Sequence, residues 1–424
     1  MRKILYLLPI GLLMLLCTSC SSFSDALSAK DIEPLTTTVK LNLQIQGLKE
    51  TKELTLRMDN YVDGVHIEKE FSGESIRVDG VIPGIYTVSI SGSAIGEGDK
   101  EYYLNGNLVN KGIFQDSETL LIEMDGLAVS PLIFKEIYYA GSRTPLVKNY
   151  FRDQYYELYN NSSETIYLDG IYFAQLTPGV ATKKLPVWPA EDAGKYAYAE
   201  RIWRFPGKGK DYPVASGESV ILAQYAVDHR LKSYNPLSPV DLSGAEFEFN
   251  VGNSMLPDQP AMDMVHVFYD GSASLGRLKQ FLTSVFGPAM TIFKVPQGEE
   301  YDPVHNSSLH TKDLGSKSRR LYAKIPIPYI LDAVECTHNE SMVDAKRVPA
   351  VLDAGMTWVG STYCSLSVAR KPLLDREGNP LRRSNGAIIL QDTNNSTQDF
   401  ESGVTPELHR YNTSIPSWSH SKKQ

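Results

Sequence analysis

Short segments in which apolar and polar residues alternate recur along the first part of the chain. The first runs from Val39 to Ile45, with apolar side chains at every second position. Alternation with a period of two places one face of a strand in a core and the other in water. The pattern returns with glycines between the segments, at 54–58, 76–78, 86–90 and 120–124. We therefore predict an antiparallel β-sandwich of about seven strands over residues 37–128.

A second series of strand-like segments begins after Ser130-Pro131. Its members are short and end in turn-forming residues, at 133–139, 154–159, 166–168 and 219–223. Short strands at regular spacing with turns between them are typical of β-sandwiches. We predict a second, larger β domain over residues 129–424, so that the whole chain is mainly β with one or two short helices.

One segment has the periodicity of a helix. Between Ser272 and Phe286, apolar residues from Leu275 to Val285 fall three or four positions apart. This spacing places them on one face of a helix, and Gly287-Pro288 would end it. We predict a helix that covers the open face of a sheet; the alternative is a helix that docks a partner.

The first residues have the features of a bacterial export signal. A basic start precedes an apolar run that is shorter than the ~20 residues of a membrane-spanning helix. The segment Leu16–Cys20 then resembles the lipobox of bacterial lipoproteins. We predict a signal peptide over residues 1–19, lipid on Cys20 and a tether over 20–36. An ordinary signal peptide with incidental cysteines is the alternative.

The residue after the lipidated cysteine bears on location. It is Ser21, whereas an aspartate there retains lipoproteins in the inner membrane of well-studied Gram-negative bacteria. The resemblance therefore favours the outer membrane, with the lipid anchor as the contact to the membrane. It leaves open whether the protein faces the periplasm or the cell surface.

Charge and motifs exclude several function classes. The chain has 42 basic and 50 acidic residues, and removal of Arg2 and Lys3 with the signal leaves 40 and 50, a formal charge of −10. Nucleic-acid binding rests on neutralisation of phosphates, which an acidic protein without a basic stripe does not provide. The sequence contains no P-loop, zinc-protease motif or nucleophile elbow. We therefore expect a non-catalytic protein with no cofactor and no nucleic-acid partner.

The cysteines and one acidic turn are candidate structural sites. Cys336 and Cys364 form an even pair in an exported chain, which favours a disulfide; two buried free thiols are the alternative. The segment with Asp392, Asn394 and Ser396 places oxygen ligands on alternate residues, as in the first half of a calcium loop. It lacks the glycine and the glutamate that complete such a loop. Turn formation by these side chains is therefore the expected role, and calcium binding the weaker candidate.

Aromatic residues are the candidate binding surface. Adjacent tyrosines on a strand point to opposite faces, so one residue of each pair is expected on an outer face. The candidates near residue 150 and beyond are Tyr139, Tyr155, Tyr156, Trp188 and Trp203. Outward aromatic rings would offer a rigid surface for a glycan, a peptide or a protein. The alternative is that a large sandwich uses these rings in its core.

Two local motifs resemble known modules. The segment Val78–Val88, with its Pro-Gly turn, resembles transthyretin-like or carboxypeptidase-regulatory-like domains, which implies that Tyr86 packs inward. The segments Tyr156–Asn160 and Leu168–Gly170 resemble those of lamin-tail-like domains. Together they resemble a family of uncharacterised Gram-negative lipoproteins that pair the two modules. Relative to a minimal lamin-tail domain, two stretches are expected to be long insertions, 174–204 and 226–325.

These features predict a membrane-anchored binding or scaffold lipoprotein of the cell envelope. The resemblance implies a first domain that acts as a stalk and a second that recognises a ligand. It also suggests a position beside an outer-membrane transporter. An accessory component of an exported hydrolase or nuclease system is one alternative, and a purely structural envelope protein is another.

Overall fold

A computed structural model describes residues 33–43, 48–60, 62–97, 100–342, 345–375 and 377–422. The predicted signal peptide, Cys20 and most of the predicted tether lie outside the described residues. Within these ranges, no helix has the length and apolar character needed to cross a membrane. The described chain is mainly β, as the alternating pattern predicted.

The chain divides into two compact units. Of the described residues, the first contains those up to Ala94 together with Leu104–Gly126. The second contains Ile95–Tyr103 together with the residues from Leu127 onward. The short segment Ile95–Tyr103 thus belongs to the second unit by its contacts, although it lies within the range 37–128 in the sequence.

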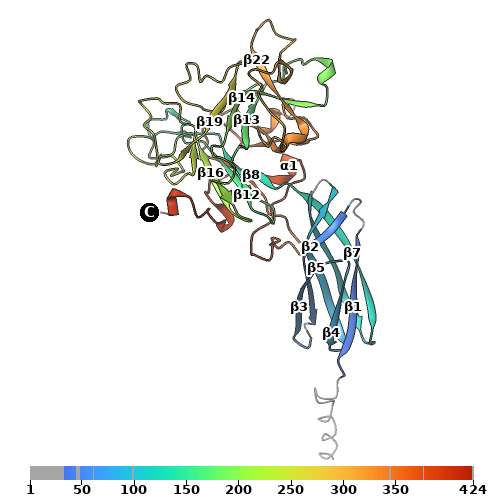
Figure 1. The fold of residues 1–424 in the computed structure, drawn as a ribbon. Coiled ribbons are helices and arrows are strands. Elements are labelled where there is room, and N and C mark those ends of the chain that lie inside the picture. Colours follow the sequence, from blue (N-terminus) through green and yellow to red (C-terminus); the bar gives the residue numbers. More distant parts are fainter. Residues whose placement is uncertain are drawn as a thin grey trace, which may run out of the picture. The chain divides into compact units, whose positions relative to one another are not determined.

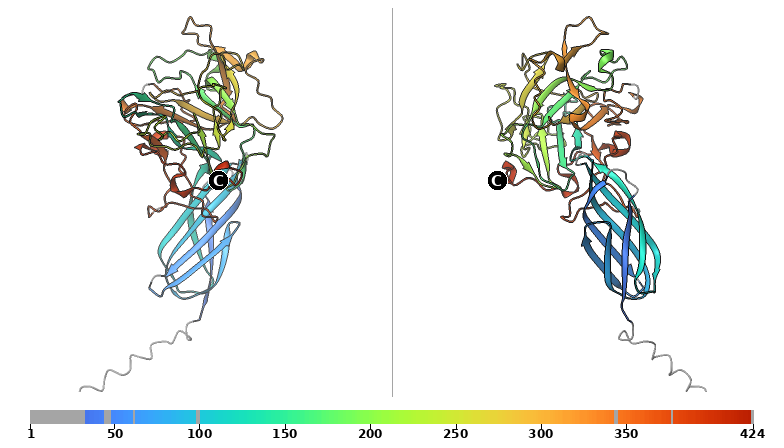
Figure 2. Two further views of the ribbon diagram at one scale, coloured as in Figure 1. Left: turned by 90° about the vertical axis from the view of Figure 1, so that its left-hand side faces the viewer. Right: turned by 45° about the vertical axis from the view of Figure 1, so that its right-hand side comes forward.

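Seven strands in the first part of the chain form one sheet (Figures 1 and 2). They are β1 (Leu35–Leu43), β2 (Leu48–Asn60), β3 (Val65–Phe71), β4 (Ser75–Val81), β5 (Gly84–Gly96), β6 (Glu101–Ile113) and β7 (Glu118–Val129). Their order is β3-β2-β5-β6-β7-β1-β4, and β1 pairs with β7 in parallel. Leu54, Leu56 and Met58 alternate on β2 and are fully buried. Tyr86 is also buried, as predicted, and its hydroxyl donates to the carbonyl of Ile82 at 2.7 Å.

Two larger sheets build the second unit. The first has the order β18-β17-β16-β11-β8-β25-β26. Its strands are β8 (Leu132–Tyr138), β11 (Tyr155–Asn160), β16 (Ser219–Ala223), β17 (Phe247–Glu248), β18 (Met262–Asp263), β25 (Ser367–Arg370) and β26 (Phe400–Val404). The second has the order β21-β22-β14-β13-β20-β23-β24, with β19 paired to β14. Its strands are β13 (Tyr172–Leu176), β14 (Tyr196–Arg204), β19 (Val265–Tyr269), β20 (Ala289–Phe293), β21 (His310–Lys312), β22 (Leu321–Pro326), β23 (Ile330–Thr337) and β24 (Thr357–Trp358).

The remaining elements of the second unit are short. Two small sheets pair β9 (Ser142–Arg143) with β10 (Asn149–Tyr150), and β12 (Ile166–Tyr167) with β15 (Pro213–Val214). One α-helix is present in the described residues, α1 (Ser396–Asp399). The other helical turns are of the 3-10 type, at Ala190–Asp192, Ser307–Leu309, Ile327–Tyr329, Glu340–Met342, Arg410–Asn412 and His420–Lys422.

The main core lies between the two larger sheets. Phe134 on β8 and Phe173 on β13 belong to one cluster of buried side chains, and their ring centroids are 6.1 Å apart. Tyr156 on β11 packs against Phe173 at 4.8 Å. Side chains from both sheets therefore interdigitate, as in a β-sandwich.

The helix predicted over 272–286 is absent, and this prediction is wrong. Gly276 has a φ of +65°, a left-handed conformation that interrupts a helix. Further along, Gln154 Nε2 donates to the Thr283 carbonyl and Gln154 Oε1 accepts from the Thr283 N–H, both at 3.1 Å. The core glutamine thus pairs with backbone groups that a helix would pair internally. The apolar spacing instead places residues such as Phe281 in the core of an irregular segment.

The two stretches expected to be insertions are integral parts of the fold. Residues 174–204 contain most of β13 and all of β14, and residues 226–325 contain β17 to β21 and most of β22. Strands β13, β14, β19 and β22 lie together in the sheet (Figure 1). These stretches therefore form much of the sheet that closes the core of the second unit.

Candidate functional site

A β-bulge interrupts the pairing of β13 and β14. Gln175 pairs with Arg201, and the next pair is Leu176 with Ala199. Glu200 therefore has no partner on β13. On its other edge, β14 pairs with β22 up to Ala199 and with β19 from Arg201 onward. Glu200 is thus unpaired on both sides, and bulges of this kind redirect the side chain that they carry.

Gly179 has no side chain, and it therefore leaves the side chains of Gln175 and Glu200 uncovered. A Cβ atom at this position would lie 2.6 Å from Gln175 Nε2 and 2.9 Å from Glu200 Oε1, so both polar atoms approach the same point. The Gly179 N–H donates to Glu200 Oε2 at 3.2 Å. Gln175 is 6% exposed, yet its side-chain amide makes no hydrogen bond to any described residue. Because Gln175 lines the groove, its amide is available to a ligand or to water.

Arg320 supplies a third polar group. Its Nη2 lies 3.8 Å from Glu200 Oε1, and its Cζ lies 4.6 Å from the ring centroid of Tyr269. The guanidinium of Arg201 lies 3.8 Å from the same ring. Stacking on one tyrosine therefore fixes the position of Arg320 beside Glu200. Glu200 and Arg320 are the charged residues of the groove lining, and their formal charges sum to zero, whereas Arg201 lies outside the lining.

These polar groups form one end of this groove, which has a volume of about 660 Å³. Much of the remaining lining is apolar, from Phe151, Val180, Leu282, Val285, Phe286 and Tyr363. The rings of Phe151 and Tyr363 pack edge to face with centroids 6.2 Å apart, and Phe286 is 47% exposed. A volume of this size, with apolar walls and a few converging polar groups, is typical of ligand sites.

The predicted aromatic surface is for the most part core, and that prediction is wrong. Tyr139, Tyr155 and Tyr156 are 0% exposed and Trp203 is 1% exposed. The hydroxyls of Tyr139 and Tyr156 donate at 2.6 Å to the Thr337 carbonyl and to Thr283 Oγ1. The reason is that β8 and β11 are central strands whose residues are buried on both faces. Adjacent tyrosines still point to opposite faces of the sheet, but both faces are covered by other parts of the protein, so both tyrosines of each pair are buried.

Trp188 is the partly exposed member of the predicted set. It stacks on Tyr198 with ring centroids 3.9 Å apart and an interplanar angle of 10°. It is not part of the groove lining. The structure therefore does not bring Trp188 together with the other predicted aromatics in one site.

The predicted disulfide is absent, since Cys336 and Cys364 are both free thiols. Cys336 is buried on β23, and burial raises the pKa of its thiol well above the ordinary value. The Cys364 thiol donates weakly to the Val359 carbonyl at 3.8 Å. The alternative of two free thiols describes this structure.

The weak calcium candidate forms a turn. Asp392 Oδ1 accepts from Arg370 at 3.1 Å, and it accepts from the N–H of Asn394 at 3.4 Å. Ser396 instead bonds to Asp353, through its N–H at 2.8 Å and its hydroxyl at 2.5 Å. Protein donors engage these oxygens separately, so the three residues do not form a common ligand set. Turn chemistry is the role that the structure gives them.

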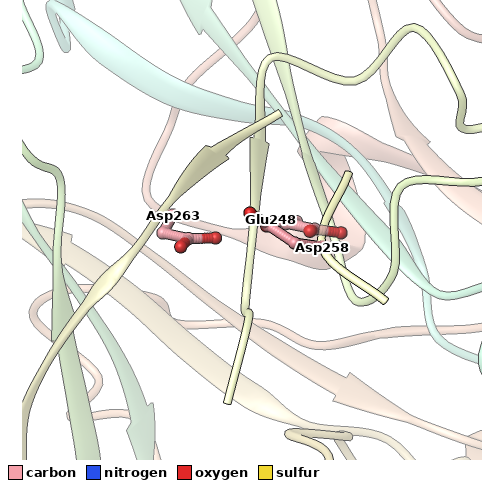
Figure 3. A group of neighbouring side chains, drawn as sticks. All are labelled: Glu248, Asp258 and Asp263. Carbon is pink, nitrogen blue, oxygen red and sulfur yellow. The ribbon is translucent and has the colours of Figure 1, made fainter. Parts of the chain in front are cut away.

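Another group of carboxylates was not anticipated. Glu248 on β17 pairs in register with Asp263 on β18, and Asp258 lies on the connecting loop. One oxygen from each lies within 4.8 Å of the others, and Figure 3 shows the Asp263 carboxylate pointing toward Glu248. Burial, together with the two aspartates, raises the pKa of Glu248 to about 7. These are the described residues best placed to hold a divalent cation.

Protein donors already engage this carboxylate group. Glu248 accepts from the N–H groups of Ala226 at 2.8 Å and of Gln259 at 3.2 Å. The Asn250 amide donates to Asp258 at 2.8 Å and to Asp263 at 3.4 Å. The group is therefore a hydrogen-bonded network in its own right, and we assign no ligand to it.

A serine, a histidine and a glutamate also meet in the second unit. Ser219 Oγ lies 2.9 Å from His409 Nδ1, and Glu157 Oε1 lies 3.7 Å from the same nitrogen. A nucleophilic triad needs the serine and the carboxylate on opposite ring nitrogens. Burial and the charge of Lys135 lower the pKa of His409 to about 4. This geometry does not activate Ser219 as a nucleophile.

Comparison with known proteins gives the family. The DUF4876 profile, described as "Protein of unknown function", matches residues 215–407. The crystal structure of a DUF4876 family protein from Bacteroides thetaiotaomicron VPI-5482 is 55% identical in sequence, with a TM-score of 0.83. The match covers 91% of this chain and 100% of that chain. The chain belongs to the DUF4876 family. No curated protein matches it.

The groove residues of this DUF4876 protein were not among the predicted site residues. Gln175 is a single polar residue in the otherwise apolar core of β13, Tyr172–Leu176, and that exception is a signal visible in the sequence. Glu200 and Arg320 reach it only through strand pairing. No local pattern marks them, because the bulge and the pairing of β14 with two partners are tertiary features.

Proposed function

We propose that this DUF4876 protein is a lipid-anchored, non-catalytic binding protein of the outer membrane, and that the groove holds its ligand. The groove carries the proposal, because it combines apolar walls with the side-chain amide of Gln175, which no described residue engages, and with Arg320 Nε, a buried nitrogen that has no hydrogen-bond partner. An unpartnered buried polar group weakens a protein unless something binds it. The lipobox-like segment Leu16–Cys20 supports the anchor, and Ser21 supports the outer membrane.

We also propose a partner, on the basis of the predicted lipid anchor and the groove. A lipoprotein tethered at Cys20 works at the membrane surface, where an outer-membrane protein such as a transporter can receive or deliver the ligand. A purely structural envelope protein would gain nothing from the open polar end at Gly179. We therefore favour binding over a structural role.

Filling the groove tests the proposal. The full mature chain, in detergent, is screened on an oligosaccharide array and on a peptide array, each with the native protein and with Gly179→Leu. The leucine would occupy the point that Gln175 and Glu200 approach, so we expect the native protein to bind and the variant to lose that binding. Gly244→Leu is the matched control, since its Cβ would meet nothing closer than Ser421 Cβ at 3.5 Å.

The outcomes separate clearly. Loss of binding in Gly179→Leu with retention in Gly244→Leu supports the groove as the ligand site. Binding that survives Gly179→Leu contradicts it, as does a native protein that binds nothing on either array. Circular dichroism of each variant confirms that the fold is intact.

A further inference from the structure

We infer that the ligand of the groove is an uncharged saccharide, an inference that rests on the proposed binding function. The polar end presents three planar groups of different hydrogen-bonding character. Gln175 offers a donor and an acceptor side by side, Glu200 only accepts, and Arg320 only donates. A hydroxyl group both donates and accepts, so neighbouring hydroxyls of a sugar ring can match all three groups.

The charges at this end select against ions. Glu200 would repel an anion, and Arg320, 3.8 Å away, would repel a cation. Their opposite charges attract no ion of either sign strongly. A neutral ligand with many polar groups is therefore the best electrostatic match.

The walls suit the apolar face of a sugar ring. Phe151, Phe286 and Tyr363 offer aromatic surface beside the polar end. Phe286 is about half exposed at 47%, so its ring is open to contact. The C–H groups of a pyranose ring form an apolar face that can pack on such rings, while its hydroxyls point to polar groups at the edge.

The strand arrangement disfavours a peptide. An extended peptide is commonly bound by adding a strand to a free sheet edge. Gln175 lies on β13, which pairs with β14 on one side and β20 on the other. Glu200 itself is unpaired, but Ala199 and Arg201 beside it on β14 are paired on both edges, and one open position is too short to add a strand. At the polar end, the groove therefore presents side chains to a ligand and no free strand edge to which a peptide could add.

Oligosaccharide titration tests the inference. Neutral oligosaccharides that bind on the array are titrated by isothermal calorimetry against the full chain, Gln175→Ala and Glu200→Gln. We expect each variant to weaken saccharide binding about ten-fold or more, because each removes hydrogen bonds between the polar end of the groove and the sugar hydroxyls. Gln297→Ala is the control, since Gln297 is exposed and outside the groove lining.

The outcomes distinguish this inference from the proposed function. If peptides or charged saccharides bind and Gly179→Leu abolishes that binding, the groove is the site but the ligand class is wrong. If neutral saccharides bind and Gln175→Ala and Glu200→Gln leave the affinity unchanged, the assigned contacts are wrong. If saccharide binding survives Gly179→Leu, both the inference and the proposed site fail.

Discussion

At the scale of single residues, Arg370 is enclosed by three carboxylates in the core of the second unit. Its guanidinium nitrogens lie 2.7 Å from Asp332, 3.1 Å from Asp392 and 3.6 Å from Asp399. Removal of one member of a buried ionic network leaves uncompensated charges and costs about 3–5 kcal/mol. We expect Arg370→Met to lower the free energy of unfolding in urea by this amount.

An exposed arginine provides the control for that measurement. Arg230 pairs with Asp228 and Asp241, but its side chain is 52% exposed. Exposed ion pairs contribute little to stability, so Arg230→Met should leave the urea midpoint nearly unchanged. Equal losses in the two variants would show that burial of the Arg370 network does not matter.

Glu246 predicts a pH dependence of stability. Burial raises the pKa of Glu246 to about 7, while its oxygens accept from the Ile221 N–H at 2.8 Å and the Ser419 hydroxyl at 2.6 Å. The folded state therefore binds the proton more tightly than the unfolded state. The stabilisation is fully present below the ordinary pKa of 4.5 and is lost as the pH rises to about 7.

Substitution by glutamine removes this contribution. From about pH 5 to about pH 8, the native protein should lose up to roughly 3 kcal/mol more unfolding free energy than Glu246→Gln does. The exposed Glu191→Gln is the control and should follow the native protein. Parallel pH profiles for the native protein and Glu246→Gln would contradict the prediction.

At the scale of elements, Gly276 distinguishes the irregular segment 272–286 from the helix that the spacing predicted. In a helix, alanine in place of glycine stabilises by about 1 kcal/mol. At a φ of +65°, alanine instead costs about 1–2 kcal/mol. Nothing lies within 4 Å of a Cβ at this position. The backbone conformation alone therefore decides whether alanine raises or lowers the stability.

We therefore expect Gly276→Ala to lower the urea midpoint of unfolding. The exposed Lys279→Ala, in the same segment, is the control and should change the midpoint little. A higher midpoint for Gly276→Ala would restore the helix prediction.

At the scale of the whole molecule, we predict that lipid on Cys20 anchors the protein to the membrane. Each buried methylene of an acyl chain contributes about 0.8 kcal/mol, so loss of the thioether removes the whole attachment. Cys20→Ala should leave the protein in the supernatant after carbonate washing of membranes, while Cys17→Ala should remain in the pellet. A Cys20→Ala protein that still pellets would contradict the lipobox prediction.

The amino-acid sequence determined the features that depend on local pattern. Alternation predicted β1, β2 and β5, because a strand with one face buried shows its environment in its own residues. The segment that forms β8 was predicted as a short strand without alternation, and all its residues are buried. The resemblance of Val78–Val88 to transthyretin-like modules implied the inward packing of Tyr86, which is buried. The strands of residues 174–204 and 226–325 were missed because the resemblance to a minimal lamin-tail domain led us to expect insertions there, although β14 alone has nine residues.

Only the tertiary structure decided which faces are covered and which residues meet. The adjacent tyrosines Tyr155 and Tyr156 alternate as expected, but whether an alternating face meets water or another layer depends on sheets formed far along the chain. Likewise, Glu200 joins Gln175 and Arg320 through a bulge and a change of strand partner. Sequence determines what each side chain can do, whereas long-range strand pairing decides which side chains act together.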